Sequence, residues 1–220
     1  MKSRYERETR AAYQDTQRAE EYQQQTRRLT WARLATWREL GQVRRMLAEC
    51  RLGSGDLVLD APCGTGIAGQ LLGQSGVSVV ALDIAMEMMA LAREDYRVDR
   101  LCGFVRADMK ALPFPARAFT GALVLGFMHR VPDSLQNAVL RDLVRVVDRY
   151  LILTFSVDNR FQRFKRSVLQ RMHGRRYTAP VPRTLADIRL SLEAQGLSVR
   201  RCRSVLPALS SSVVILAERT

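Results

Sequence analysis

Two glycines directly after a short apolar segment are well placed in this sequence to contact a ligand. Residues 57–59 are consecutive apolar residues, which is typical of a strand that is buried on both faces. Asp60 ends this segment, Gly64 and Gly66 follow it, and the sequence predicts a helix over residues 67–74. Glycine reaches positive φ and has no Cβ. A strand, glycine turn and helix in this order therefore bring backbone N–H groups close to a bound molecule.

An acidic residue after the next apolar segment indicates that the bound molecule is a nucleotide. Residues 77–82 predict a second strand, which ends in Asp83, roughly twenty residues beyond Asp60. At this offset a nucleotide-binding βαβ unit carries the carboxylate that binds the ribose hydroxyls.

The remaining segments of the chain are expected to form the sheet and helices that position these residues. Further strands are expected over residues 102–107, 119–125, 150–155, 197–205 and 212–217, and helices over 31–47, 85–93, 134–147 and 184–195. We expect Ser134 to cap the third of these helices and Gly196 to end the last. The alternation predicts an α/β fold: a doubly wound, mostly parallel, seven-stranded Rossmann-like sheet with an antiparallel pair at its edge.

Residues 1–50 are predicted to form an N-terminal helical cap, and residues 51–220 the domain that carries the site. Within the cap, Leu34 and Trp37 belong to a helical apolar pattern that is expected to pack on the sheet. In a parallel sheet, ligands bind beyond the carboxyl ends of the strands. Asp60, Asp83, Asp108 and the segment 126–129 all lie at such ends, which predicts a single site there.

Composition narrows the class of protein. The chain has 220 residues, 47% of them hydrophobic, and a net charge of +13, which favours polyanions, anionic lipid surfaces or phosphorylated substrates as partners. An arginine-rich composition from a GC-rich genome explains the charge equally well.

No apolar run approaches the roughly 18 residues of a membrane span, and the first residues lack a signal-peptide core. Four scattered cysteines and two histidines indicate neither a disulfide framework nor a metal site, so a cytoplasmic location is expected, including the inner face of a membrane.

Residues 159–183 are predicted to form a basic lid. Its first part, residues 159–176, is rich in arginine, lacks acidic residues and has apolar residues on one side, as in a basic amphipathic helix. Arg163, Arg166, Arg171 and His173 are its candidate substrate contacts. The alternatives are an arginine face that is only solvated, or a membrane-surface or nucleic-acid contact.

Several motifs together resemble a known family. They are VLDAPCGTG at 58–66, ALDIAMEM at 81–88, ADM at 107–109, LPF at 112–114 and MHRVPD at 128–133. With this spacing, and with a tyrosine-bearing segment at 19–22, the chain resembles class I S-adenosylmethionine-dependent methyltransferases of the compact, ubiquinone-biosynthesis-like type. Pro62 departs from the family pattern, in which glycine is commoner, and Thr120 stands where an aspartate often opens the fourth strand.

The resemblance implies a set of residues that bind S-adenosylmethionine. The backbone at Gly64 and Gly66 would lie under its methionine part, with Asp60 holding the loop, and Asp83 would accept from the ribose hydroxyls. Asp108 would accept from the adenine amino group beside the Met109 N–H. The full set is Asp60, Ala61, Cys63, Gly64, Thr65, Gly66, Asp83, Ile84, Met88, Asp108, Met109, Leu125 and Gly126.

The resemblance also implies the chemistry, which is in-line transfer of a methyl group to an oriented acceptor with one proton to manage. His129 is the candidate proton acceptor because imidazole ordinarily titrates near neutral pH, and Tyr13 and Tyr22 are candidates to close over the site. After methyl transfer, the cofactor would be released as S-adenosylhomocysteine.

Other enzyme classes and acceptors fit the sequence less well. A nicotinamide dehydrogenase would need a GxGxxG turn, and an amino-methyltransferase of nucleic acids a Pro-Pro-aromatic loop after the fourth strand. Cys63 lies in the glycine turn and is not expected to be a nucleophile. The sequence favours O-methylation of a small, lipid-linked or sugar-linked acceptor, anionic acceptors included. The alternatives are a methyltransferase acting on RNA or another polyanion, and a non-catalytic binding subunit with the same fold.

Overall fold

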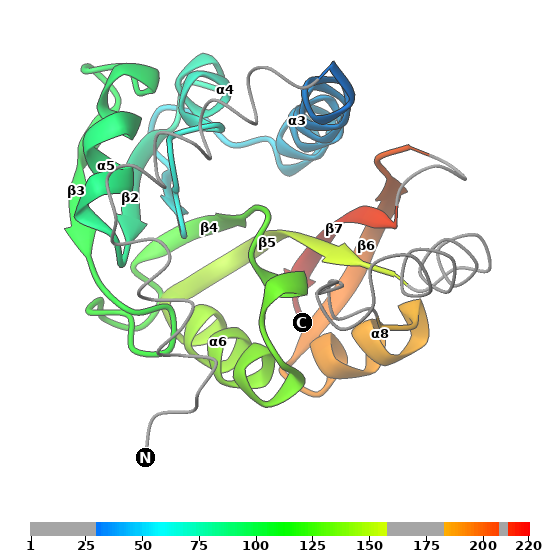
Figure 1. The fold of residues 1–220 in the computed structure, drawn as a ribbon. Helices are drawn as coiled ribbons and strands as arrows, with labels where there is room; N and C mark the ends of the chain where they lie inside the picture. The colour runs from blue at the N-terminus through cyan, green and yellow to red at the C-terminus, as the bar shows by residue number, and fades with distance from the viewer. Residues whose placement is uncertain (1–29, 158–182, 207–210) are drawn as a thin grey trace.

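In a computed structural model, the chain forms a three-layer α/β fold around one sheet (Figure 1). The structure describes residues 30–157, 183–206 and 211–220. Its strands are β1 Leu57–Asp60, β2 Ser78–Asp83, β3 Leu101–Arg106, β4 Phe119–Val124, β5 Val147–Ser156, β6 Leu197–Ser204 and β7 Ser212–Arg219. The predicted strands are thus all present, and the predicted α/β class is confirmed.

The strand order is β3-β2-β1-β4-β5-β7-β6. Strands β1 to β5 pair in parallel, whereas β7 runs antiparallel to both β5 and β6. The predicted antiparallel pair at the edge is confirmed, with β6 as the outer strand and β7 inserted beside β5. This order brings the carboxyl ends of β3, β2, β1 and β4 to neighbouring positions along one edge.

Helices cover both faces of the sheet, with α3, α4 and α5 on one face and α6 and α8 on the other (Figure 1). They are α3 Thr30–Cys50, α4 Gly69–Gln74, α5 Met86–Ala92, α6 Asp133–Val146 and α8 Leu185–Glu193, with single 3₁₀ turns η1 Arg93–Asp95 and η2 Met128–Arg130. Alternate strand residues enter the two cores: Leu151 and Leu153 of β5 pack toward α6 and α8, and Ile152 packs toward α3.

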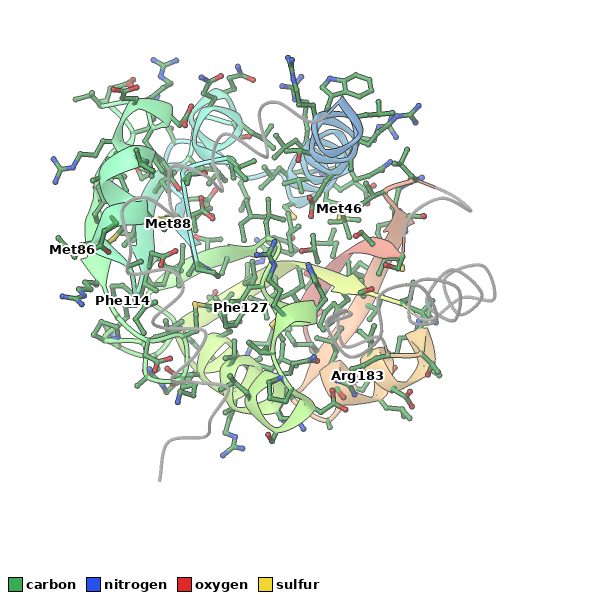
Figure 2. The ribbon with its side chains drawn as sticks, in the orientation of Figure 1. Met46, Met86, Met88, Phe114, Phe127 and Arg183 are labelled. Carbon is green, nitrogen blue, oxygen red and sulfur yellow. The ribbon has the colours of Figure 1, made fainter. Side chains whose placement is uncertain are left out.

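Helix α3 packs against the sheet through only part of its predicted apolar pattern. Val43, Met46 and Cys50 are buried, and Met46 points from the helix toward the strands (Figure 2). Trp37 is 68% exposed and Leu34 is 37% exposed, so the prediction that they pack on the sheet is wrong. The helical period explains this outcome, because the spacing of Val43, Met46 and Cys50 turns Trp37 outward.

Of the two residues predicted to mark helix ends, Gly196 is confirmed and Ser134 is not. Thr184 caps α8 through a capping box with Asp187, and Gly196 follows α8 with a φ of +75°. The prediction that Ser134 caps α6 is wrong, because α6 begins at Asp133 and its N-cap is Pro132, which makes no side-chain cap. Helix α4 begins at Gly69, two residues after the predicted start, because residues 61–68 form turns instead.

Candidate functional site

The turn after β1 is held by backbone bonds to the two strands beside it. Ala61 N–H donates to the carbonyl of Leu123 on β4 at 3.0 Å, and Cys63 N–H donates to the carbonyl of Leu82 on β2 at 2.8 Å. The Ala61–Pro62 peptide is cis. The turn therefore has a fixed position at the carboxyl ends of β1, β2 and β4, as the sequence predicted.

Gly64 and Gly66 need glycine for different reasons. Both have positive φ, +53° and +81°. A Cβ on Gly66 would lie 2.9 Å from the backbone oxygen of Ala92, whereas a Cβ on Gly64 would meet no atom within 4 Å. Gly66 thus permits the close packing of the turn on α5, and Gly64 borders open space that a ligand can occupy.

Asp83 connects the turn to the end of β2. Its Oδ2 accepts from Gly64 N–H at 2.9 Å and its Oδ1 accepts from Ala85 N–H at 2.9 Å. Each oxygen keeps a further lone pair, so the carboxylate can also accept from a diol. The sequence predicted that Asp60 would hold this loop. In the structure, the carboxylate that accepts from Gly64 N–H is that of Asp83. Asp83 is 7% exposed, and burial raises the pKa of its carboxyl, opposed by these N–H bonds.

Asp60 lies deeper than Asp83 and is paired with a residue that the sequence analysis did not select. Tyr96 donates its phenolic hydrogen to Asp60 Oδ2 at 2.5 Å. Burial raises the pKa of Asp60 to about 7, the Tyr96 bond lowers it, and the charge of Asp83 raises it. Burial and the charges of Asp60 and Asp83 also raise the pKa of the Cys63 thiol, which keeps it protonated, as expected for a residue that is not a nucleophile.

The ends of β3 and β4 complete the edge. After β3, Asp108 Oδ1 accepts from Lys110 N–H at 3.1 Å, and Oδ2 lies 3.8 Å from Lys110 Nζ. After β4, Gly126 has a φ of +65°, a Cβ there would meet no atom within 4 Å, and its N–H donates to Thr154 Oγ1 at 2.7 Å. The neighbouring turns thus contain two glycines, Gly64 and Gly126, that border open space.

His129 lies in the turn η2 after β4. Its Nδ1 is buried and has no hydrogen-bond partner among the described residues. Burial, and then the charge of Arg130, lower the pKa of His129 to about 4. The expectation that this imidazole titrates near neutral pH is therefore wrong, because the desolvated ring resists a positive charge. The ring is neutral at pH 7, with a nitrogen that can bond to a ligand.

Known proteins with similar sequences are methyltransferases. A family model described as a methyltransferase domain matches residues 58–149. Malonyl-[acyl-carrier protein] O-methyltransferase of Pectobacterium atrosepticum is 44% identical over 69 residues, 31% of this chain and 26% of that protein. Ubiquinone/menaquinone biosynthesis C-methyltransferase of Coxiella burnetii is 34% identical over 109 residues, 46% of this chain and 42% of that protein. The chain thus spans less than half the length of these curated relatives.

Solved structures extend the likeness to the whole fold. Magnesium protoporphyrin IX methyltransferase from Synechocystis PCC 6803, with bound S-adenosylhomocysteine, superposes with a TM-score of 0.79. The match covers 98% of this chain and 100% of that chain at 21% identity. Residues 58–149 thus match a methyltransferase domain, and the whole chain has the fold of this solved methyltransferase.

The residues predicted to bind the cofactor lie at the carboxyl ends of β1 to β4. Those after β1 and β2 are Asp60, Ala61, Cys63, Gly64, Thr65, Gly66, Asp83, Ile84 and Met88, and those after β3 and β4 are Asp108, Met109, Leu125 and Gly126. Met88 lies beside β2 and is 3% exposed (Figure 2). Ala61, Thr65 and Met109 are buried among them.

The remaining predicted site residues, except His129, lie outside the part of the chain that the structure describes. Tyr13, Tyr22, Arg163, Arg166, Arg171 and His173 lie outside the described residues, as does most of the predicted lid. Among the described residues, no group of three or more His, Cys, Asp or Glu side chains could hold a metal ion, and no helix is long and apolar enough to cross a membrane.

Sequence reasoning also missed Glu39 and Thr154 near the site. Glu39 lies on α3, and Thr154 lies near the carboxyl end of β5. Burial raises the pKa of Glu39 to about 7, and the Thr154 hydroxyl and the charge of Arg130 lower it. Its place on the helix was a usable signal, because the half-buried Glu39 precedes the buried Val43 by four residues and so lies on the same face of α3.

Proposed function

We propose that the chain is an S-adenosylmethionine-dependent methyltransferase. The observation that carries the proposal is the pairing of Gly64, which borders open space, with Asp83, whose carboxylate holds the Gly64 N–H and keeps lone pairs for a diol. The residues at the strand ends fit this cofactor, with Asp83 for the ribose, Asp108 for the adenine amino group and Met88 as an apolar wall. The cofactor, when bound, supplies an activated methyl group on a sulfonium sulfur.

We propose that the acceptor receives the methyl group on an oxygen atom. An anionic acceptor, such as a carboxylate, fits the site well. A hydroxyl acceptor must lose a proton, but His129, with a pKa of about 4, is a weak base at pH 7. A carboxylate has no proton to remove, so the chain's residues need only bind and orient it and exclude water. The net charge of +13 attracts such a substrate, and the arginines predicted for the lid, Arg163, Arg166 and Arg171, suit its recognition. The O-methyltransferase among the relatives supports the same class.

A labelling experiment tests this function. The purified chain is incubated with methyl-labelled S-adenosylmethionine and the small-molecule, lipid and nucleic-acid fractions of a bacterial lysate. We expect label in a small or lipid-linked compound, released as volatile methanol by mild alkali because methyl esters hydrolyse under these conditions. Alkali-stable label would contradict a carboxylate acceptor, and label in the nucleic-acid fraction would support the polyanion alternative. Cofactor binding without any transfer would support a non-catalytic subunit.

A further inference from the structure

The loop between β3 and β4 contains the residues proposed to hold the adenine of the cofactor. Asp108 and Met109 lie at its start, and Leu112 and Phe114 lie in its middle (Figure 2). Residues 107–118 belong to no helix or strand, so the N–H and carbonyl groups of this loop need partners from elsewhere in the chain.

Two side chains of α6, Asp142 and Arg145, supply partners for Leu112 and Phe114. The Leu112 N–H donates to Asp142 Oδ2, and Arg145 Nη2 donates to the Leu112 carbonyl at 2.8 Å. Arg145 Nη1 donates to the Phe114 carbonyl at 2.6 Å, and Arg145 Nε donates to Asp142 Oδ1 at 2.7 Å. Both backbone polar groups of Leu112 are thus bonded to one ion pair on α6, which we call the Asp142–Arg145 clamp.

The chemistry of the clamp matches the groups that it binds. A carboxylate accepts at both of its oxygens, and a guanidinium donates from three nitrogens in one plane. An amide at residue 142 would turn its NH2 group toward one of two donors. An exposed ion pair contributes little by itself, but this one is bonded to the backbone of Leu112, which is 4% exposed. The clamp therefore fixes the middle of the loop on α6.

A short turn connects the clamp to the proposed adenine contacts. The Ala111 N–H donates to the Asp108 carbonyl at 2.9 Å, and the Lys110 N–H donates to Asp108 Oδ1 at 3.1 Å. Leu112 follows Ala111 directly, and its side chain lies in the same apolar core as that of Met109. A shift of Leu112 relative to α6 would therefore move Ala111, and with it the backbone and the carboxylate of Asp108.

We infer that the Asp142–Arg145 clamp positions Asp108 so that its carboxylate recognises the adenine amino group of S-adenosylmethionine. The inference rests on the proposed function, in which Asp108 accepts from that amino group. Asp142 and Arg145 act through the loop, so they are positioning residues. A site that is built to bond to an amino group rejects a ligand that lacks it, but only while the acceptor is held in place. The clamp thus contributes to selectivity for adenine.

The test compares S-adenosylhomocysteine with its 6-deamino analogue, in which a hydrogen atom replaces the adenine amino group. Calorimetry measures both affinities, and the wild-type chain should prefer S-adenosylhomocysteine by about tenfold or more, the usual effect of a hydrogen bond to a charged group. Asp108→Ala should abolish this preference. Arg145→Met should reduce it to below about threefold, because the carboxylate then lacks a fixed position. Asp142→Asn should also reduce it, and it provides a second test if Arg145→Met does not fold.

A double mutant shows whether the clamp acts through Asp108. Adding Arg145→Met to Asp108→Ala should change the preference no further, because the group that Arg145 positions is already absent. Arg117→Met is the matched control. Arg117 lies near the end of the same loop and pairs with Asp148 on the surface at 3.6 Å, so its loss should leave the preference unchanged.

Thermal unfolding of each variant ensures that binding is compared well below the midpoint. A clamp that only stabilises the fold would let Arg145→Met and Asp142→Asn weaken both ligands by the same factor, and this result would overturn the inference. A wild-type chain that binds both ligands equally would also overturn it, while leaving the proposed function intact. A wild-type chain that binds neither ligand would overturn both.

Discussion

The phenolic hydroxyl of Tyr96 donates a 2.5 Å hydrogen bond to Oδ2 of Asp60, and both side chains are buried. Asp60 ends β1 at the centre of the sheet, and Tyr96 follows the 3₁₀ turn after α5. The pair joins the first strand to the helical layer directly below the glycine turn. A carboxyl group with this degree of burial keeps its proton at a higher pH than an exposed one, which makes the stability of the domain depend on pH.

The first prediction concerns this dependence. In the folded chain the pKa of Asp60 is about 7, against a value near 3.8 when it is exposed. Between these pH values the folded state binds more protons than the unfolded state, so the Asp60 contribution is fully present below pH 4 and is lost as pH rises to 7. Relative to Asp60→Asn, the wild-type free energy of unfolding should therefore fall across this window, by an amount on the order of a few kcal/mol.

Urea unfolding of both proteins at pH steps from 4 to 8 measures this difference. Glu39 shifts stability in the same direction and His129 in the opposite one, since its pKa is lowered. Both groups are present in wild type and variant, so their effects cancel in the comparison. Parallel stability curves for the two proteins would show that Asp60 does not titrate in this range.

The second prediction tests the nucleotide site. Asp83→Ala should weaken binding of both S-adenosylmethionine and S-adenosylhomocysteine by roughly 1.5–3 kcal/mol, the range for losing hydrogen bonds to a charged group. Calorimetry measures both affinities, with NAD as a ligand that should not bind. Asp99→Ala is the matched control, because Asp99 is an exposed acid that pairs with Arg97 at 2.9 Å. Equal affinities for wild type and Asp83→Ala would mean that the ribose lies elsewhere.

The third prediction is the protonation state of His129. Burial and Arg130 hold its pKa at about 4, so its ring should stay neutral from pH 6 to 9. The chain has two histidines, and the spectrum of His129→Asn assigns the ring signals in a proton–carbon NMR titration. A titration midpoint for His129 near 6.5 would contradict the desolvated environment and would restore the general-base hypothesis.

The fourth prediction compares two glycines with nearly equal backbone geometry. Gly66 and Gly76 have φ of +81° and +78°, but only at Gly66 would a Cβ meet backbone atoms, with Ala92 O at 2.9 Å. Both alanine variants carry the strain of positive φ, whereas Gly66→Ala adds overpacking of roughly 1–3 kcal/mol. Thermal unfolding should therefore show a larger loss for Gly66→Ala. Equal losses would indicate that the turn can move away from α5.

The sequence by itself determined the α/β class, the mostly parallel sheet with its antiparallel edge pair, and the strand ends where the site is expected. These features follow from local information: apolar segments that become strands, glycines at turns, and acids at strand ends. Asp60, Gly64 and Asp83 could be placed in this way because each is fixed by its position next to a strand. Gly196 was predictable as the end of α8 because glycine readily adopts the positive φ that ends a helix.

Only the tertiary structure decided which groups pair and how they ionise. Tyr96 and Asp60 are 36 residues apart, so no local pattern joins them. The outward position of Trp37 depends on which stripe of α3 faces the sheet. The pKa of His129 depends on the desolvation of its ring, which is a property of the packed chain and not of the residue type.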